Sequence, residues 1–212
     1  MAQFQPVVAD ELADLIATDL MAVGRHGRAG ALRVAIDGPL AAGPHELADA
    51  IADGVRFRGR PAVHILAETF WRDASLRLEF GHTDPHSLLH DWLDVDALRR
   101  ELLDPLSAAG TGRYLPSLRD PASNRATREP PRTAEPGTIV LLSGELLLGH
   151  ELPFDRTIHL ALSSAARQRR TPDDLRWKLA AYDEYDATST PVTQADVVVK
   201  VDDPRHPALR ST

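Results

Sequence analysis

Five short apolar runs, rich in β-branched residues, alternate with helical segments along the chain. They occupy residues 31–36, 61–66, 138–142, 156–162 and 195–201. Runs of this length are typical of buried strands, and the helical segments between them indicate βαβ units, whose strands are parallel. We therefore expect an α/β fold, with a parallel sheet of about five strands flanked by helices.

The chain of 212 residues is long enough for one hydrophobic core but short for two. Apolar side chains at Val8, Leu12, Ile16 and Leu20 recur at helical spacing, so we expect residues 1–30 to form an amphipathic helix and a linker. That helix could dock a partner or simply cap the core. Residues 31–212 are predicted to form the single domain. Within it, residues 110–137 are too long for a plain connection and indicate a hairpin or a substrate-covering loop.

Composition narrows the classes of partner. A net charge of −7 without a long basic run argues against nucleic-acid binding, which needs many Lys and Arg side chains on phosphates. No apolar run approaches the roughly 20 residues that cross a bilayer, and no signal-peptide pattern opens the chain. The absence of cysteine excludes disulfides and thiolate metal sites. We expect a cytoplasmic protein that binds small molecules or proteins, and the excess of arginine over lysine suggests a bacterial gene.

A Gly-rich turn follows the first apolar run and precedes a helical segment. Gly38 and Gly43 have the spacing of a Walker A phosphate loop, which continues with Lys and then Ser or Thr. In such a loop the lysine reaches the transferable phosphate and the hydroxyl holds Mg²⁺. Here Pro44 replaces the lysine and His45 replaces the hydroxyl, so a positive charge and a hard oxygen ligand are missing. Two glycines alone would also fit an ordinary tight turn.

The segment Glu68-Thr69-Phe70-Trp71-Arg72, directly after the second apolar run, resembles the D-x-F-[YH]-R segment of uridine kinases. This resemblance to the uridine-kinase branch of the P-loop nucleoside kinases extends over residues 32–207 and includes Leu102-Leu103-Asp104-Pro105-Leu106 and the closing run at 195–204. It implies that Glu68 is the base that takes the proton from a nucleoside 5′-hydroxyl. It also implies that Phe70, Trp71 and Arg72 bind the substrate.

The same resemblance assigns further residues. It implies that Asp84 holds the ribose hydroxyls and that Tyr114 and Arg119 belong to a hairpin over the nucleobase, although Tyr114 could equally pack that hairpin. Arg167, Arg169 and Arg170 match an arginine-bearing lid over the phosphates, and they also fit a solvated helix face. Ser143 stands where the family has the Walker B carboxylate that organises Mg²⁺.

Three histidines, His82, His86 and His90, recur at four-residue spacing. The spacing invites a metal site, but Pro85 opposes one continuous helix through all three, and the sequence places no further ligand. We therefore expect solvated histidines and assign no metal ligands.

The resemblance implies ATP-dependent phosphoryl transfer, with Mg²⁺, to the 5′-hydroxyl of a nucleoside or similar small alcohol. The altered positions at Pro44, His45 and Ser143 all lie on the phosphate side. Activity is thus expected to be reduced or lost. The alternative is a non-catalytic protein that binds a nucleoside or nucleotide, or that regulates an active paralogue or assembles with itself.

Overall fold

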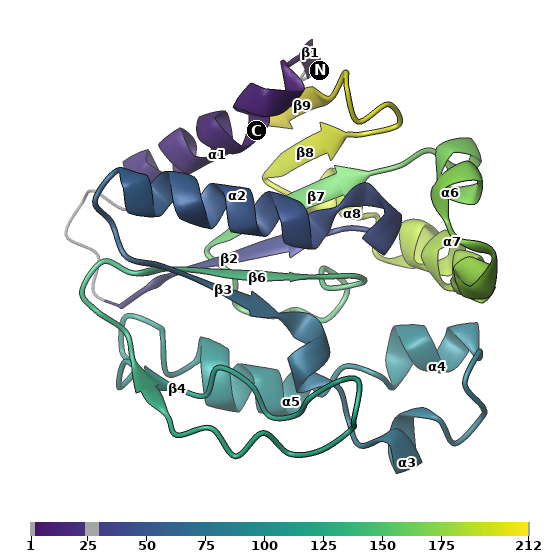
Figure 1. Ribbon diagram of the computed structural model, residues 1–212, viewed down its shortest axis with the longest axis horizontal. Helices are drawn as coiled ribbons and strands as arrows, with labels where there is room; N and C mark the ends of the chain where they lie inside the picture. Colours follow the sequence, from purple (N-terminus) through teal and green to yellow (C-terminus); the bar gives the residue numbers. More distant parts are fainter. Residues whose placement is uncertain (1–2, 24–29, 212) are drawn as a thin grey trace.

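The computed structural model describes residues 3–23 and 30–211, and its centre is a seven-stranded sheet with helices on both faces (Figure 1). Five strands are parallel, in the order β8, β7, β2, β6 and β3, while β9 and β1 continue the sheet beyond β8 as antiparallel strands. The expected α/β fold is confirmed. Strands β1 and β9 were not predicted, because they are too short to carry a clear alternation. The strands of the sheet are β1 (Gln5–Pro6), β2 (Leu32–Asp37), β3 (Ala62–Leu66), β6 (Ile139–Gly144), β7 (Arg156–Ala161), β8 (Val197–Lys200) and β9 (Ala208–Ser211).

Helices connect these strands, and none of those in the described ranges is long and apolar enough to span a bilayer. The α-helices are α1 (Ala9–Val23), α2 (Pro44–Phe57), α3 (Ala74–Arg77), α4 (Pro85–His90), α5 (Val95–Leu98), α6 (Ser164–Arg170), α7 (Leu179–Thr188) and α8 (Pro191–Gln194). Short 3₁₀ helices cover Leu40–Ala42, Ala67–Phe70 and Asp173–Lys178, and a π-helix covers Arg99–Leu103.

The core lies on both faces of the sheet, because every residue of β2 and β6 is buried. On one face, α1 and α2 cover the strands, with Ile16, Leu20 and Ile51 fully or almost fully buried. On the other, Phe70 and Leu102 pack against β6 side chains. Burial of one such side chain contributes about 1.5–3 kcal/mol, so these two layers supply much of the stability.

The N-terminal helix α1 packs along α2 through Leu12, Ile16 and Leu20. Its side chain Asp14 also forms an ion pair with Arg58 at 2.5 Å. Helix α1 therefore caps the core, and a docking role for it stays a prediction. The predicted linker falls largely on residues 24–29, which lie outside the described residues.

A third apolar cluster joins α4 to α7 near the carboxyl ends of the parallel strands. Leu88, Leu89 and Trp92 pack there against Ala181 and Tyr185. The segment at residues 110–137 contains the predicted hairpin, in which β4 (Arg113–Tyr114) pairs antiparallel with β5 (Arg132–Thr133). The loops that follow β2, β3, β6 and β7 meet at one edge of the sheet, as they do in parallel α/β folds.

Candidate functional site

The phosphate-loop segment has the backbone of a strand, turn and helix. After β2 the chain turns at Gly38, forms the 3₁₀ turn Leu40–Ala42, and enters α2 at Pro44. A Cβ on Gly38 would lie 2.9 Å from Leu160, and Gly43 has φ 80°, so both positions need glycine. Pro44 suits the first position of a helix because its φ is already helical.

Two amides of this loop are used within the turn itself. The Ala42 N–H donates to the Pro39 carbonyl at 2.7 Å, and the Gly43 N–H donates to the Leu40 carbonyl at 3.0 Å. Pro44 has no N–H to offer. Positions 42 to 44 therefore offer no free backbone N–H to a bound anion.

Asp37, the last residue of β2, holds this loop to its surroundings. It is fully buried, and its carboxylate accepts from the Leu147 N–H at 2.8 Å and from the Tyr185 hydroxyl at 2.9 Å. His159 Nδ1 lies 2.7 Å from the same carboxylate. Burial, and then the charge of Asp37, raise the pKa of Tyr185, so that this hydroxyl stays a donor. The sequence interpretation did not single out Asp37.

A chain of hydrogen bonds and one ion pair joins the start of α2 to β3, β6 and Glu68. Ser143 Oγ lies 2.6 Å from His45 Nδ1 and 2.6 Å from His64 Nε2. His64 Nδ1 in turn lies 2.7 Å from Asp49 Oδ1, and His45 Nε2 lies 3.2 Å from Glu68 Oε1. We call these five residues the histidine–serine chain. They come from α2, β3, β6 and the 3₁₀ turn after β3, so only the fold brings them together.

Protons along the histidine–serine chain can be assigned from its hydrogen bonds. The Asp49 carboxylate can only accept, so His64 carries its proton on Nδ1 and accepts through Nε2. The Ser143 hydroxyl therefore donates to His64 and accepts from the Nδ1–H of His45. A second proton, on Nε2 of His45, would face the carboxylate of Glu68.

Electrostatics favour that second proton on His45. Burial is the largest single influence on its pKa and acts against the charge. The neighbouring carboxylate of Glu68, helped by Glu46 and Glu145, outweighs burial and raises the pKa of His45. A proton on Nε2 of His45 would thus place a positive charge at the start of α2, facing Glu68.

Glu68 itself is buried and incompletely satisfied. Its exposed fraction is 8%, and neither carboxylate oxygen receives a well-aligned hydrogen bond from the described residues, since His45 lies at ion-pair distance only. The indole N–H of Trp92 also lacks an acceptor within that part of the chain. The residues Glu68 and Trp92 line one cavity of about 10 Å³, together with Trp71 and His150, a space for about one water molecule. Buried polar groups without partners mark a place that a ligand can complete.

A buried ion pair closes the phosphate side of the site. Lys178 Nζ lies 2.5 Å from Glu145 Oε1, and the Tyr182 hydroxyl donates to the other oxygen of Glu145. Burial, and then the charge of Glu145, raise the pKa of Tyr182. Lys178 and Tyr182 also line a cavity of about 210 Å³ with Leu40 and Ala41 of the phosphate loop. The chain has only two lysines, Lys178 and Lys200, and this rarity was the one sequence signal that could have marked Lys178.

The predicted lid arginines occupy α6 and have different environments. Arg167 is buried, forms ion pairs with Asp183 at 2.5 Å and Asp186 at 2.8 Å, and stacks on Tyr182. Arg170 donates to the Val201 carbonyl at 2.5 Å. Arg169 is exposed. A phosphate-binding role for these three residues stays a prediction, and Arg167 would have to leave two carboxylates to perform it.

The residues predicted to bind substrate surround Glu68 only in part. Phe70 is fully buried in the core, whereas Trp71 lies in the cavity beside Glu68, with its ring 5.0 Å from that of Trp92. The backbone N–H of Arg72 donates to the Trp92 carbonyl at 2.8 Å. The structure thus places Trp71 beside Glu68, the predicted base, whereas Phe70 is buried in the core next to them in sequence.

The other predicted substrate residues have structural partners of their own. Asp84 caps α4 by accepting from the Ser87 N–H at 2.7 Å, and this hydrogen bond lowers the pKa of Asp84. Tyr114 is buried, and burial raises its pKa. Arg119 forms an ion pair with Asp73 at 3.1 Å. Their roles toward ribose and base stay predictions.

Comparison with known proteins identifies the fold. No family model and no curated protein sequence matches the chain. Among solved structures, a possible uridine kinase from Bacillus stearothermophilus is 21% identical, with a TM-score of 0.66 over 89% of this chain and 98% of that one. The chain has the fold of a P-loop kinase.

Two further structures agree with this fold. A proposed fructose transport system kinase from Silicibacter sp. TM1040 is 19% identical, with a TM-score of 0.63 over 84% of this chain and 95% of that one. The YGR205w protein is 10% identical, with a TM-score of 0.58 over 97% of this chain and 99% of that one. At these identities the likeness concerns the fold alone.

The residues at the phosphate side do not fit the Mg²⁺–ATP complex that this fold usually holds. Mg²⁺ prefers oxygen ligands, and a Walker A loop supplies a lysine to the phosphates. Here the hydroxyl of Ser143 and the imidazole of His45 are hydrogen-bonded to each other, and Pro44 contributes neither charge nor donor. Glu145 is already paired with Lys178.

Proposed function

We propose that this chain is a binding protein on a P-loop kinase fold, which takes a nucleoside or a similar small alcohol beside Glu68 and transfers no phosphate. The observation that carries the proposal is the state of Glu68, a buried carboxylate without a well-aligned partner next to the unpaired indole N–H of Trp92. A ligand hydroxyl can donate to the one and accept from the other, which would satisfy both groups at once.

The loss of turnover follows from the phosphate side. A kinase stabilises the charge of the transferring phosphoryl group with preorganised donors and a metal ion, and loss of one such donor typically costs about 10²–10³ in rate. Three positions that supply this stabilisation are Pro44, His45 and Ser143 here. Two of these residues, His45 and Ser143, belong instead to the histidine–serine chain, which ends at Glu68, where the alcohol would bind.

The small volume of the cavity beside Glu68 indicates that binding needs side-chain movement. A space of about 10 Å³ does not hold a nucleoside, so Trp71 and Trp92 must shift when a ligand enters. All three tryptophans of the chain lie close together, because the ring centroids of Trp177 and Trp92 are 5.7 Å apart and Trp71 also packs against Trp92. Tryptophan fluorescence therefore reports on the region around this cavity.

The test is a titration of the full chain with uridine and, separately, with fructose and ribose, followed by fluorescence and calorimetry. We expect saturable binding of at least one of these alcohols, and a loss of affinity of tenfold or more in Glu68→Gln. The control is Glu135→Gln, the same change at an exposed position, which should bind as the unaltered chain does. Equal binding by both variants, or no binding of any of the alcohols, would contradict the proposal.

One observation favours phosphoryl transfer as the second candidate function. The ammonium group of Lys178 lies beside the phosphate loop, and from there it could take the place of the missing lysine. Incubation with Mg²⁺, ATP and the alcohol that binds, followed by mass spectrometry, tests this candidate. A phosphorylated product that disappears in Lys178→Met would favour transfer, and no product over the unaltered background would favour binding alone.

A further inference from the structure

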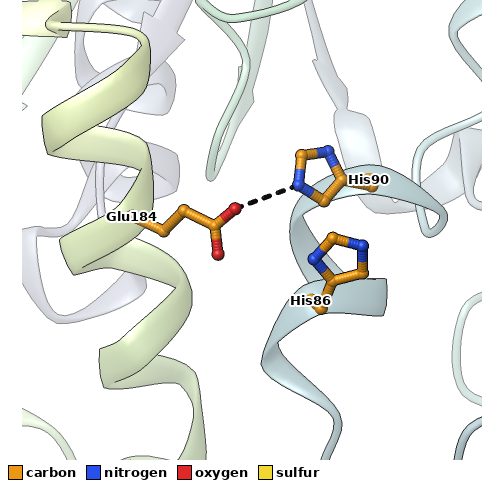
Figure 2. A group of neighbouring side chains, drawn as sticks. All are labelled: His86, His90 and Glu184. Atoms are coloured by element: carbon orange, nitrogen blue, oxygen red, sulfur yellow. Dashed lines mark hydrogen bonds and ion pairs between the residues drawn. The ribbon is translucent and has the colours of Figure 1, made fainter.

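Two histidines of α4 and a glutamate of α7 face one another on the surface, as Figure 2 shows. His86 and His90 are one helical turn apart, and their ring centroids are separated by 4.3 Å. Glu184 Oε1 lies 3.2 Å from His90 Nε2, and one potential ligand atom from each of the three residues falls within 4.8 Å of the others. All three side chains are exposed, so water and ions can reach them.

We propose that His86, His90 and Glu184 form a zinc site that fastens α4 to α7. Two imidazoles and one carboxylate are a ligand set that zinc accepts, with the fourth position left to water. Ligands about 2.0–2.1 Å from a tetrahedral zinc ion are about 3.3 Å from each other, which the His90–Glu184 pair already matches. The imidazole majority selects zinc over Mg²⁺ or Ca²⁺, which prefer oxygen ligands.

The backbone around the cluster favours this geometry. Pro85 begins α4, so His82 lies outside the helix, while His86 and His90 share one of its faces. The apolar cluster beneath, with Leu88 and Leu89 of α4 against Ala181 and Tyr185 of α7, already holds the two helices together. The metal would therefore need only small rotations of three exposed side chains, and no movement of the backbone.

A zinc ion in this position would link the segment beside Glu68 to the segment that carries Lys178. Helix α4 carries Leu88, which lines the cavity at Glu68, and α7 follows directly after Lys178. A bound metal would restrict the separation of these segments. This inference is independent of the proposed function, because it needs neither a nucleoside nor ATP.

The test uses the full chain, first treated with a chelator and then titrated with zinc chloride by calorimetry, with stoichiometry from native mass spectrometry. We expect one zinc ion per chain, and at least tenfold weaker binding in each of His86→Ala, His90→Ala and Glu184→Gln. His206→Ala is the matched control, since His206 also forms an exposed pair with a carboxylate, Asp203, at 2.9 Å. It should bind zinc as the unaltered chain does, and magnesium chloride should give no signal.

Three outcomes would overturn the zinc site. The first is a dissociation constant weaker than about 1 mM for the unaltered chain. The second is zinc binding that survives His86→Ala combined with His90→Ala. The third is zinc-dependent dimerisation in sedimentation, which would mean that the ligands come from two chains. Zinc bound between α4 and α7 should also raise the midpoint of thermal unfolding of the unaltered chain. It should not raise that midpoint in the variant with both His86→Ala and His90→Ala.

Discussion

The ion pair between Lys178 and Glu145 offers a quantitative test of how the phosphate side is closed. Lys178→Met keeps most of the side-chain volume and removes the charge. The side chains of Lys178 and Glu145 are 6% and 3% exposed, so the carboxylate that remains cannot be solvated by water. The Tyr182 hydroxyl still donates to it, but one neutral hydrogen bond does not replace an ammonium group.

Removal of one partner from a buried pair typically costs about 3–5 kcal/mol, because it leaves an uncompensated charge. For a chain of this length each kcal/mol lowers the unfolding midpoint by about 2–4 °C, so Lys178→Met should lower it by about 6–20 °C. Removal of both charges, in Lys178→Met with Glu145→Gln, should restore much of the loss, since the glutamine still accepts from Tyr182.

Urea unfolding, followed by circular dichroism, measures these differences in the free energy of unfolding. The control is Lys200→Met, which removes the only other lysine. Lys200 is exposed and lies over the Phe4 ring at 4.1 Å, a contact worth about 0.5–1 kcal/mol. The reasoning is refuted if Lys178→Met is no more destabilising than Lys200→Met, or if the double variant is no more stable than Lys178→Met.

Three further predictions concern the histidine–serine chain and the loop. Ser143→Ala removes two hydrogen bonds at 2.6 Å and leaves two imidazole nitrogens unpaired, so urea unfolding should show a loss of about 1–3 kcal/mol. The folded-state pKa of His45 is raised, so its stabilising charge is fully present below the unfolded value of about 6.5 and is lost as pH rises through the folded value. In the unaltered chain the urea midpoint should therefore fall as the pH rises above 6.5, and in His45→Gln this fall should be smaller. An unchanged dependence of the urea midpoint on pH would count against the ion pair between His45 and Glu68. Pro44→Lys combined with His45→Thr restores the Walker A residues and should create calorimetric binding of Mg²⁺–ATP; no gain would indicate that other groups, such as Glu145 with Lys178, keep the site closed.

Several parts of the fold could be predicted from the sequence because they depend on local patterns. The five parallel strands follow from apolar β-branched runs, and their observed bounds differ from the predicted ones by one or two residues. The turn at Gly38 and Gly43 follows from glycines, whose positive φ angles favour a residue without a Cβ. Strands β1 and β9 were missed, because each forms through antiparallel pairing with its neighbour and its own sequence contains no apolar run.

Some residues of the candidate site were predictable from the sequence, but their arrangement was not. Glu68, Trp71 and His45 were identified from motif positions, and the structure brings all three together. Lys178 and His64 were missed, since neither belongs to a motif: Lys178 ends the 3₁₀ helix Asp173–Lys178, and His64 is a residue of β3. In the same way, the histidines of α4 had no visible third ligand, because Glu184 is 94 residues from His90.

The sequence by itself determined the α/β class, the turn at Gly38 and Gly43, and the presence of Pro44, His45 and Ser143 where a kinase motif would have a lysine, a hydroxyl and a carboxylate. These depend on the period of apolar residues and on the identity of single side chains, both of which can be read locally. Only the tertiary structure decided which side chains His45 and Ser143 contact. His45, His64 and Ser143 meet because β3 and β6 are adjacent strands and α2 begins at their carboxyl edge, and strand order is set by packing over long sequence distances.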